Sequence, residues 1–580
     1  MTWQWTSLKQ SPGNDASAMW LMQDGSILVN LTGSKKLVAL YPDDKGSYAN
    51  GSWIDAGDFL LEKLNFSSAV LSDGRLVACG GEQTGPGLPT TESNFCEIYD
   101  PRTLLSTAIA PPPGWMSIGD SPSVVLNDGT FMLGNTQGKG DQVALLNPTT
   151  LTWTLGGGDS DNEQGYTLLQ TGDVLTAGVY DQTSQHYDPT AQKFVPDAPL
   201  PVMLGAGSEI GPGLTLMDGR VVWFGANGHT CIYTPGGASA TGAWAQVHDM
   251  PVLRKAGQLV TNDSTAILEP NGKVFLVSWA AKSGVVFLEY DPVADSYAIV
   301  DNAPVTGNRE GTKMLLLPSG NGLVSAPLDN GEHGWYEVTF DQTHDASWAP
   351  QITSFPASVE TNTTVTLEGT QLCGLSECQS FGDDNQQAEH YPMVRFVSSA
   401  GDVYYARAHD VSSRSMAPLQ KATVSVDIPG DLATGTYCVQ VVAMGIPSPC
   451  VSVQVKLRQS LFIEGLVALL FGGVASDGGG WVVIHGVRIP VDPGPLLRAF
   501  SGLSQEMQDT LVGRSIERLA TFLNNAAAGR AIREIVLRME ARQQRQGEFQ
   551  QSRSFWSQLA QNVAFFALGV LSALLISKLF

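Results

Sequence analysis

The chain has 580 residues, of which only 15% are charged and 62 are Gly, and its formal net charge is −23. This length exceeds that of one ordinary domain, and the composition is typical of a loop-rich β protein, which excludes a coiled coil and a disordered chain. Residues 456–580 hold 13 basic and 9 acidic residues, so the first 455 residues hold 20 basic and 47 acidic. Such an acidic head repels phosphate backbones, so we expect no nucleic-acid partner.

A short pattern recurs seven times in the first part of the chain: an apolar strand, a tight turn that ends in Gly, and a second apolar strand. SSAVLSDGRLVACGG and PGLTLMDGRVVWFG are two examples. Asp-Gly and Asn-Gly between apolar runs are strong hairpin signals, because both turn residues tolerate positive φ. The turn glycines recur at intervals of 43 to 55 residues: Gly25, Gly74, Gly129, Gly172, Gly219, Gly272 and Gly320. A repeat of about 50 residues built from short strands predicts a seven-bladed kelch-type β-propeller over residues 1–347.

Further markers fill out the repeat. A third strand that ends in a Pro turn follows several hairpins, as in IYDPRT at 98–103 and HYDPTAQKF at 186–194. Trp53, Trp153 and Trp244 fall where an outer fourth strand is expected. The N-terminal TWQWTSL is expected to add a strand to the last blade and so close the ring. The same N-terminus lacks a basic start followed by an apolar core, so we expect no cleavable signal peptide.

The pattern resembles the galactose oxidase/kelch superfamily, and the resemblance continues past the propeller. Residues 348–456 are similar to the immunoglobulin-like early-set domain that follows the propeller in galactose oxidase and glyoxal oxidase. The similarity is carried by ITSFPASVETNTTVTLEGTQL, VRFVSSAGDVYYARAHDVSSRS and DIPGDLATGTYCVQVVAMGIPSPCVSVQV. Alternating strands with regular turn signals independently favour a β-sandwich here. The resemblance covers about three-quarters of the chain.

Copper chemistry does not follow from the resemblance, because fold alone does not carry function. Copper radical oxidases hold one copper with two tyrosines and two histidines, and one tyrosine is cross-linked to a cysteine. Here Ser67 stands at the position of that cysteine, Asp120 at that of the cross-linked tyrosine, and Glu310 and Gly311 at the Tyr-His pair. Only His409, in ARAHDVSSRS, matches a ligand. One ligand of four does not hold Cu(II), so we expect no copper and no radical cofactor.

Acidic or amide residues replace the missing copper ligands, and they recur nine or ten residues before every turn Gly. They are Asp15, Asn65, Asp120, Glu163, Glu209, Asp263 and Glu310. In a propeller this position begins the innermost strand, near the axis. With His409, these residues are candidates for binding a ligand or a cation. Six carboxylates around one channel raise each other's pKa or attract a basic ligand, a polyhydroxylated ligand or a hard cation such as Ca²⁺. The alternative is structural: such side chains stabilise their own loops by accepting backbone N–H bonds.

The seven cysteines do not form a CxxC zinc pattern. Cys79, Cys96 and Cys231 fall in propeller strands and are interpreted as small buried thiols. Cys373 and Cys378 are close enough in sequence to close a small loop disulfide, although the spacing does not require one.

The C-terminal 124 residues leave the resemblance behind. Residues 457–493 combine an apolar stretch of 14 residues, too short for a membrane span, with GWVVIHGVRIPVDP, which predicts a small hairpin. Apolar residues at helical spacing over 494–553 predict an amphipathic helical stalk that packs or mediates homo-oligomerisation.

Residues 554–580 predict a terminal transmembrane helix. Residues 563–580 contain a single charge, Lys578, and 18 helical residues span about 27 Å, close to the thickness of a bilayer core. Arg533, Arg538, Arg542, Arg545 and Arg553 precede it and no Arg follows it. By the positive-inside rule we expect a single-pass tail anchor with the N-terminal head in the cytoplasm. The alternative is an apolar helix buried in an oligomer or a partner.

Three functions follow from these patterns. The first is a membrane-anchored binding or scaffold protein whose propeller loops bind a protein or a glycan. The second is a carbohydrate-active enzyme that uses paired carboxylates as acid and base. The third is a residual oxidoreductase. Missing catalytic residues, the stalk and the anchor favour the first, so we do not expect copper radical oxidase activity.

Overall fold

The computed structural model describes residues 3–89, 91–136, 142–157, 163–280, 283–305, 307, 309–381 and 390–456, together with the backbone of strands 481–484 and 487–490. The chain divides into two compact units. The first consists of Met1–Val359, Thr363–Pro429 and Thr436–Gln454, and the second of Glu360–Asn362, Gly430–Gly435 and Val455–Phe580. The described residues contain no α-helix and one 3-10 turn, η1 (Ala346–Trp348).

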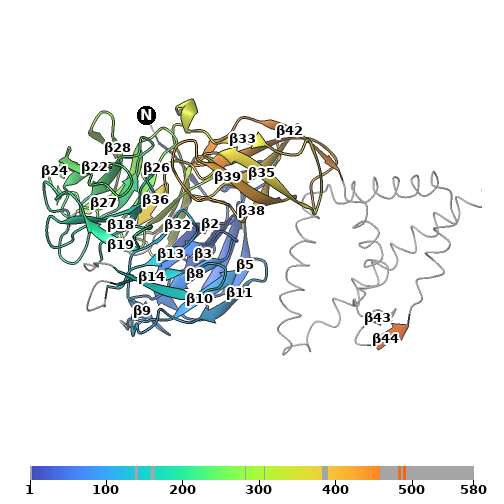
Figure 1. Cartoon of the computed structure of the whole chain (residues 1–580), viewed down its shortest axis with the longest axis horizontal. Helices are drawn as coiled ribbons and strands as arrows, with labels where there is room; N and C mark the ends of the chain where they lie inside the picture. Colours follow the sequence, from blue (N-terminus) through green and yellow to red (C-terminus); the bar gives the residue numbers. More distant parts are fainter. Residues whose placement is uncertain are drawn as a thin grey trace, which may run out of the picture. The chain divides into compact units, whose positions relative to one another are not determined.

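Seven antiparallel sheets form a seven-bladed β-propeller, as the repeat predicts (Figure 1). The first three blades contain β2 (Ala16–Leu21), β3 (Ile27–Leu31), β4 (Lys36–Tyr41) and β5 (Ser52–Asp58); β7 (Ser67–Val70), β8 (Leu76–Cys79), β10 (Cys96–Asp100) and β11 (Leu105–Ile109); and β12 (Ser123–Val125), β13 (Phe131–Leu133), β14 (Gln142–Leu146) and β15 (Trp153–Gly157). The next two contain β16 (Thr167–Leu168), β17 (Val174–Ala177), β18 (Ser184–Asp188) and β19 (Lys193–Pro196); and β20 (Gly213–Thr215), β21 (Val221–Phe224), β22 (Thr230–Thr234) and β23 (Ala243–Gln246).

Blade 6 contains β26 (Thr265–Leu268), β27 (Val274–Ala280), β28 (Gly284–Asp291) and β29 (Ser296–Val300), and blade 7 contains β30 (Lys313–Leu316), β31 (Gly322–Pro327) and β32 (His333–Thr339). The N-terminal strand β1 (Gln4–Ser7) pairs with β32 and supplies the fourth strand of blade 7. The predicted closure of the ring is therefore confirmed. The connections also contain two small two-stranded sheets. In one, β6 (Lys63–Leu64) pairs with β9 (Gln83–Thr84), and in the other β24 (Val252–Leu253) pairs with β25 (Gly257–Gln258).

The hairpin turns follow from local chemistry. Gly25 has φ +79°, and its N–H donates to the carbonyl of Met22 over 2.9 Å. Asp24 closes the turn by accepting from the N–H of Ser26 over 3.0 Å. The strands on either side are buried throughout, as β2 and β3 show. We call the end of the propeller with these turns the turn face. The opposite end, where the fourth strand of each blade leads to the first strand of the next, is the connection face.

A second group of strands follows η1. They are β33 (Gln351–Ser354), β34 (Ser358–Glu360), β35 (Thr364–Thr370), β37 (Met393–Ser398), β38 (Val403–His409), β39 (Lys421–Asp427), β40 (Gly435–Ala443), β41 (Ile446–Pro447) and β42 (Val451–Lys456). The order is β33-β35-β39-β38-β37-β40-β42-β34, with β41 beside β40. The immunoglobulin-like identity of this region stays a prediction.

This second group packs on the turn face of the propeller. The ring of Tyr405 fills the space beside Gly25, where an added Cβ would lie 2.4 Å from ring carbon Cγ. Arg407 donates from Nη2 to the carbonyl of Asp73 over 2.6 Å. Gly445 lies against Gly320, where an added Cβ on Gly445 would be 2.6 Å from the Cα of Gly320. These turns therefore need Gly both for their backbone conformation and for this close packing.

The axis of the propeller is closed by residues that the repeat does not predict. Strand β36 (Gln379–Phe381), from the connection between β35 and β37, pairs with β26 and becomes the innermost strand of blade 6 (Figure 1). We define the axial residues as 375–381 together with His390, Tyr391 and Arg414. The side chains of Tyr391 and Arg414 are buried, and so is that of Glu377.

In each of the seven blades, the strand that comes first in the sequence, apart from β1, bonds to an axial residue. In blade order, the bonds are Tyr391 Oη to the carbonyl of Leu21; Arg414 Nη1 to the carbonyl of Val70, 2.6 Å; His390 Nε2 to the carbonyl of Val125, 3.0 Å; Leu168 N–H to Glu377 Oε2, 3.0 Å; Ser376 Oγ to the carbonyl of Thr215, 2.6 Å; Leu268 N–H to the carbonyl of Cys378, 2.7 Å; and Leu316 N–H to Gln379 Oε1, 3.3 Å. The axial residues thus satisfy backbone groups that the inner edge of each blade leaves unpaired.

The cysteine pairing differs from the sequence interpretation. Cys79 and Cys96 are not free thiols: they face each other on β8 and β10 and form a disulfide. Cys438 and Cys450 form a second disulfide. The suggested pair Cys373–Cys378 is wrong, because neither cysteine forms a disulfide and Cys373 Sγ donates to the carbonyl of Ser413 instead.

In the second unit, the predicted hairpin over GWVVIHGVRIPVDP is confirmed: β43 (Trp481–Ile484) pairs with β44 (Val487–Pro490). The predicted apolar segment 457–480, the helical stalk 494–553 and the anchor 554–580 lie outside the described residues. Within the described residues, no helix has the length and apolarity needed to cross a bilayer.

Candidate functional site

The seven acidic and amide candidates all lie at the connection face. Each precedes the innermost strand of its blade by one to four positions, so all seven lie at strand starts and far along the strand from the turn Gly. Asn65, Glu163 and Asp263 have positive φ of 49°, 51° and 49°. Asn and Asp adopt this left-handed conformation more readily than other side-chain-bearing residues, which gives two of these positions a structural reason for their residue type.

Asp120 lies in an acidic cluster. Burial raises the pKa of Asp120 to about 6, and the negative charges of Glu82, Glu92 and Asp263 add to this effect. Burial and the charge of Glu82 also raise the pKa of Glu92. Asn65 joins the cluster, because its Nδ2 donates to Glu82 Oε2 over 3.1 Å. We define the acidic cluster as Glu82, Glu92, Asp120 and Asp263.

Glu82 and Glu92 were missed by sequence reasoning. Both lie in the connection between β8 and β10, not in the repeated position that precedes each innermost strand. The available signal was the length of this connection, which spans residues 80–95 and carries two Glu. Long loops at the mouth of a propeller are where added side chains reach the axis.

Arg309 forms ion pairs with two of the candidate acids, Asp263 and Glu310. Its Nη2 lies 3.1 Å from Asp263 Oδ2 and 3.4 Å from Glu310 Oε1. Its guanidinium stacks on the ring of Trp279, with 4.0 Å from Cζ to the ring centroid. These contacts hold the guanidinium in place, and its positive charge partly compensates the negative charges of Asp263 and Glu310.

The remaining candidates have local surroundings of their own. Asp15 is buried and receives a 2.8 Å contact from His333 Nδ1, while burial raises its pKa against the effect of that histidine. Glu209 forms an isolated β-bridge with Ala206. Glu163 is half-buried at the start of blade 4.

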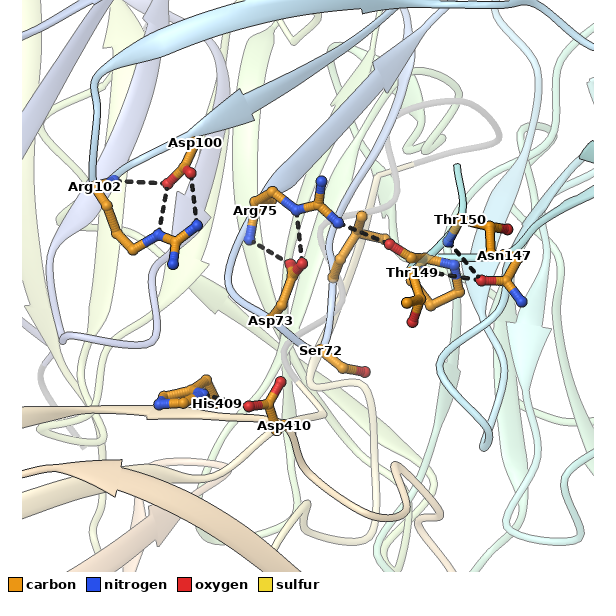
Figure 2. Close-up of polar contacts among 12 residues, drawn as sticks. Ser72, Asp73, Arg75, Asp100, Arg102, Asn147, Thr149, Thr150, His409 and Asp410 are labelled. Atoms are coloured by element: carbon orange, nitrogen blue, oxygen red, sulfur yellow. Dashed lines mark hydrogen bonds and ion pairs between the residues drawn. The ribbon is translucent and has the colours of Figure 1, made fainter. Parts of the chain in front are cut away.

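His409 lies at the opposite end of the propeller from these acids. It ends β38, and its neighbour Asp410 donates a backbone N–H to the carbonyl of Ser72, in the hairpin turn of blade 2 (Figure 2). The two ring nitrogens of His409 face Asp410 Oδ2 at 2.7 Å and Asp427 Oδ1 at 3.2 Å. The structure therefore does not bring His409 together with the acidic and amide residues.

The donor set does not fit the copper site of the resembled oxidases. The hydroxyl of Ser67 is buried and donates to the carbonyl of Ser121, and His409 is engaged at the turn face. Across the described residues, no group of three or more His, Cys, Asp or Glu is arranged to hold a metal ion. We derive no chemistry through copper for this chain.

Stability should depend on pH through Asp120. Because its folded pKa of about 6 exceeds the usual value of 3.8, the folded state binds the proton more tightly than the unfolded state. This group therefore favours folding most below pH 4 and loses that contribution as the pH rises to 6. One pKa unit corresponds to about 1.4 kcal/mol, so we expect Asp120→Asn to raise the free energy of unfolding by ~3 kcal/mol at pH 7.

Urea unfolding of the full chain at pH 4.5 and pH 7 measures this effect, with the exposed Asp329→Asn as control. A gain for Asp120→Asn that is equal at both pH values, or no gain at pH 7, would contradict a raised pKa for Asp120.

The fold and the site together define a seven-bladed propeller that carries the acidic cluster at the connection face. No model of a known protein family matches the sequence, and no curated protein sequence matches it. Among solved structures, a fungal alcohol oxidase of the AA5 family in complex with copper is 15% identical, with a TM-score of 0.47 over 79% of this chain and 99% of the other.

Two further structures are similar over the propeller. A catalytically inactive virginiamycin B lyase from Staphylococcus aureus with quinupristin is 8% identical, with a TM-score of 0.41 over 58% of this chain and 100% of the other. The structure of YjhT is 10% identical, with a TM-score of 0.34 over 58% of this chain and 98% of the other. At these identities and scores, none of the three transfers an activity to this chain.

Proposed function

We propose that this protein is a binding or scaffold protein that receives a partner protein at the connection face of its propeller and is held on a membrane by residues 554–580. The proposal rests on a difference between the two propeller faces: the turn face is covered by other strands of the chain, and the connection face carries exposed apolar side chains. The turn face is covered by the strands from β33 to β42, and its axial end is closed by the axial residues. The loops of the connection face include described residues whose side chains are exposed to solvent.

Large apolar side chains are exposed on this face. Leu60, Met116 and Met203 lie in connections between successive blades, Tyr180 lies between β17 and β18, and Val252 lies in β24. Their exposed fractions are 46%, 88%, 41%, 56% and 69%, respectively. These five are half of the ten large apolar side chains exposed among the described residues, and they include the aromatic and Met side chains that are enriched in protein-binding surfaces. A sugar ligand does not require this distribution, so a protein partner is favoured over a glycan.

Membrane attachment is the second part of the proposal. It is supported by the predominantly apolar sequence of residues 563–580, which contains the single charge of Lys578 and is long enough to span a bilayer core. Together with the expected cytoplasmic position of the head, it would present the connection face to soluble partners near a membrane surface.

The full-length protein in detergent, applied to arrays of peptides and of glycans, tests the location of the binding surface. We expect Met116→Asp with Val252→Asp to weaken binding of a retained ligand at least tenfold, because two apolar anchors become charged. Val293 is the matched control, since it is 91% exposed in the turn between β28 and β29 at the other face. Equal losses from Val293→Asp and the double variant, or retention of glycans alone, would refute the proposal.

A further inference from the structure

Arg414 carries two N–H groups that no described group of the protein accepts. The residue is only 1% exposed and belongs to the axial residues. Its Nη1 donates to the carbonyl of Val70 over 2.6 Å, but Nε and Nη2 are buried and have no hydrogen-bond partner among the described residues. Unpaired donors of this kind are rare in folded proteins, because burial removes the hydration of each group and returns no bond. An acceptor placed at this edge of the guanidinium would therefore be bound strongly.

The two unpaired atoms of Arg414 lie on one edge of its planar guanidinium group. The N–H bonds of Nε and Nη2 run parallel from this edge, and together they match the two oxygens of a carboxylate-like oxyanion, each of which accepts one bond. A water molecule offers a single oxygen to the same edge. The pattern of paired and unpaired atoms on Arg414 therefore favours a planar ligand with two adjacent acceptors.

The positive charge of Arg414 also lacks a partner. Among the described residues, no carboxylate forms an ion pair with its guanidinium. Burial lowers the pKa of Arg414, but an arginine still keeps its proton at neutral pH. Its Cζ lies 5.1 Å from the centroid of the Tyr391 ring, a cation–π contact that compensates part of the charge. The remaining charge attracts an anion strongly, because the buried surroundings screen it little.

The acidic groups that act on Arg414 are Cys373, Tyr391 and Glu377, and each of them holds its proton at neutral pH. Tyr391 Oη and Cys373 Sγ both donate to backbone carbonyls, so neither group is ionised. Burial raises the pKa of the Cys373 thiol to about 12. Burial also raises the pKa of Glu377 to about 8, although the charge of Arg414 opposes this, so its carboxyl is mostly protonated at pH 7. None of the three therefore serves as the counterion of Arg414.

A second buried atom without a partner lies among the same axial residues. His390 Nε2 donates to the carbonyl of Val125 over 3.0 Å, whereas Nδ1 has no hydrogen-bond partner in the described part of the chain. Glu377 Oε1 is 3.8 Å from Nδ1, beyond hydrogen-bond distance. Burial lowers the pKa of His390 well below its usual value, so its ring is neutral. The single buried positive charge here is that of Arg414, which makes its open edge the anchor of the site.

We propose that the axis of the propeller encloses one small planar oxyanion of the carboxylate class, bound side-on by Nε and Nη2 of Arg414. The same residue joins two blades: its Nη1 donates to Val70 in blade 2, and its backbone N–H donates to the carbonyl of Asn127, in the hairpin turn of blade 3, over 2.8 Å. An anion that fixes the guanidinium therefore stabilises the closed ring. This site is independent of the partner proposed for the connection face and of membrane attachment.

Formate, the smallest carboxylate, is the probe for this site. Equilibrium dialysis of the full-length protein in detergent against labelled formate should show one bound formate per chain. Reversible urea unfolding in sodium formate and in sodium gluconate of equal ionic strength provides a second measurement. Above the dissociation constant, each tenfold rise in formate should raise the folding equilibrium constant about tenfold, because the anion binds the folded state. Gluconate is too bulky for a closed axis and should have no such effect.

Substitutions at Arg414 locate the anion. Arg414→Met should abolish formate binding, and Arg414→Lys, which keeps a positive charge without the two-donor edge, should weaken it at least tenfold. Arg407→Met is the matched control and should leave the affinity unchanged, because Arg407 is already paired with Asp427 over 2.9 Å. If the parent chain binds no formate and unfolds equally in both salts, Arg414 holds water only and the anion site is refuted. Equal affinities of the parent chain and Arg414→Lys, or equal losses from Arg407→Met and Arg414→Met, refute it as well.

Discussion

Replacing Glu97 with Gln should lower the free energy of unfolding by about 3–5 kcal/mol, the largest effect we expect from a single substitution in the propeller. Lys63 Nζ and Glu97 Oε1 are 2.6 Å apart, and both side chains are fully buried. The Phe59, Phe66 and Phe95 rings surround the ammonium group, with centroids 4.8, 5.5 and 5.7 Å from Nζ. The substitution leaves Lys63 as a buried cation with no opposite charge.

The carboxamide of the variant can still accept the N–H of Leu60, which donates to Glu97 Oε2 over 2.7 Å. The expected loss therefore reports on the charge of Lys63 and not on this backbone bond. Burial already lowers the pKa of Lys63, against the effect of Glu97, so the unpaired amine will also lose its proton more readily.

Urea unfolding of the full chain in detergent measures the loss, with Lys63→Met/Glu97→Met as the control. Replacing both partners removes the buried charges together, so the double variant should recover most of the lost stability. A loss below 1 kcal/mol for Glu97→Gln, or a double variant less stable than the single one, would show that this ion pair does not behave as a buried pair.

Alanine at three axial positions should destabilise the propeller by about 4–12 kcal/mol. Ser376, Glu377 and Gln379 bond to the innermost strands of blades 5, 4 and 7, and Ser376 Oγ also accepts from the N–H of Cys378 over 3.0 Å, so the three replacements remove a partner from four buried backbone groups. Such a group costs about 1–3 kcal/mol. The backbone pairing of β36 with β26 is retained in Ser376→Ala/Glu377→Ala/Gln379→Ala, so the loss isolates the side-chain bonds.

Unfolding and limited proteolysis of this triple variant measure the effect. Lys421→Ala/Thr423→Ala, on the exposed side of β39, is the matched control and should change stability by less than 0.5 kcal/mol. If the triple variant unfolds like the parent chain, the axial bonds contribute nothing and the ring is closed by β1 alone.

The blades themselves could be predicted from the sequence because their information is local. An Asp-Gly or Asn-Gly pair between two apolar runs determines a hairpin within about a dozen residues, and the recurrence of that hairpin determines seven blades. The addition of β1 to β32 was predicted because an incomplete last blade requires a fourth strand. The hairpin of β43 and β44 depends on the same local chemistry.

The candidate site was predicted only in part. The repeat places Asp120 and Asp263 at strand starts, since equivalent positions of a propeller lie at the same end, and the negative charge of Asp263 contributes to the raised pKa of Asp120. It gave no indication of Glu82 and Glu92, which lie outside the repeated position. His409 was grouped with the acids from its place in a resembled motif, yet β38 ends beside the hairpin turn of blade 2, at the other face.

By itself, the sequence determined the class of fold, the number of blades and the positions of the hairpin turns. The tertiary structure alone decided which distant residues meet: Cys79 with Cys96 in place of Cys373 with Cys378, β36 with β26, and Arg414 with the inner edge of blade 2. Hairpins depend on the φ preferences and hydrogen bonds of neighbouring residues, which can be inferred from the local sequence. Contacts between distant segments depend on register and packing, which are settled only when the whole ring has closed around its axis.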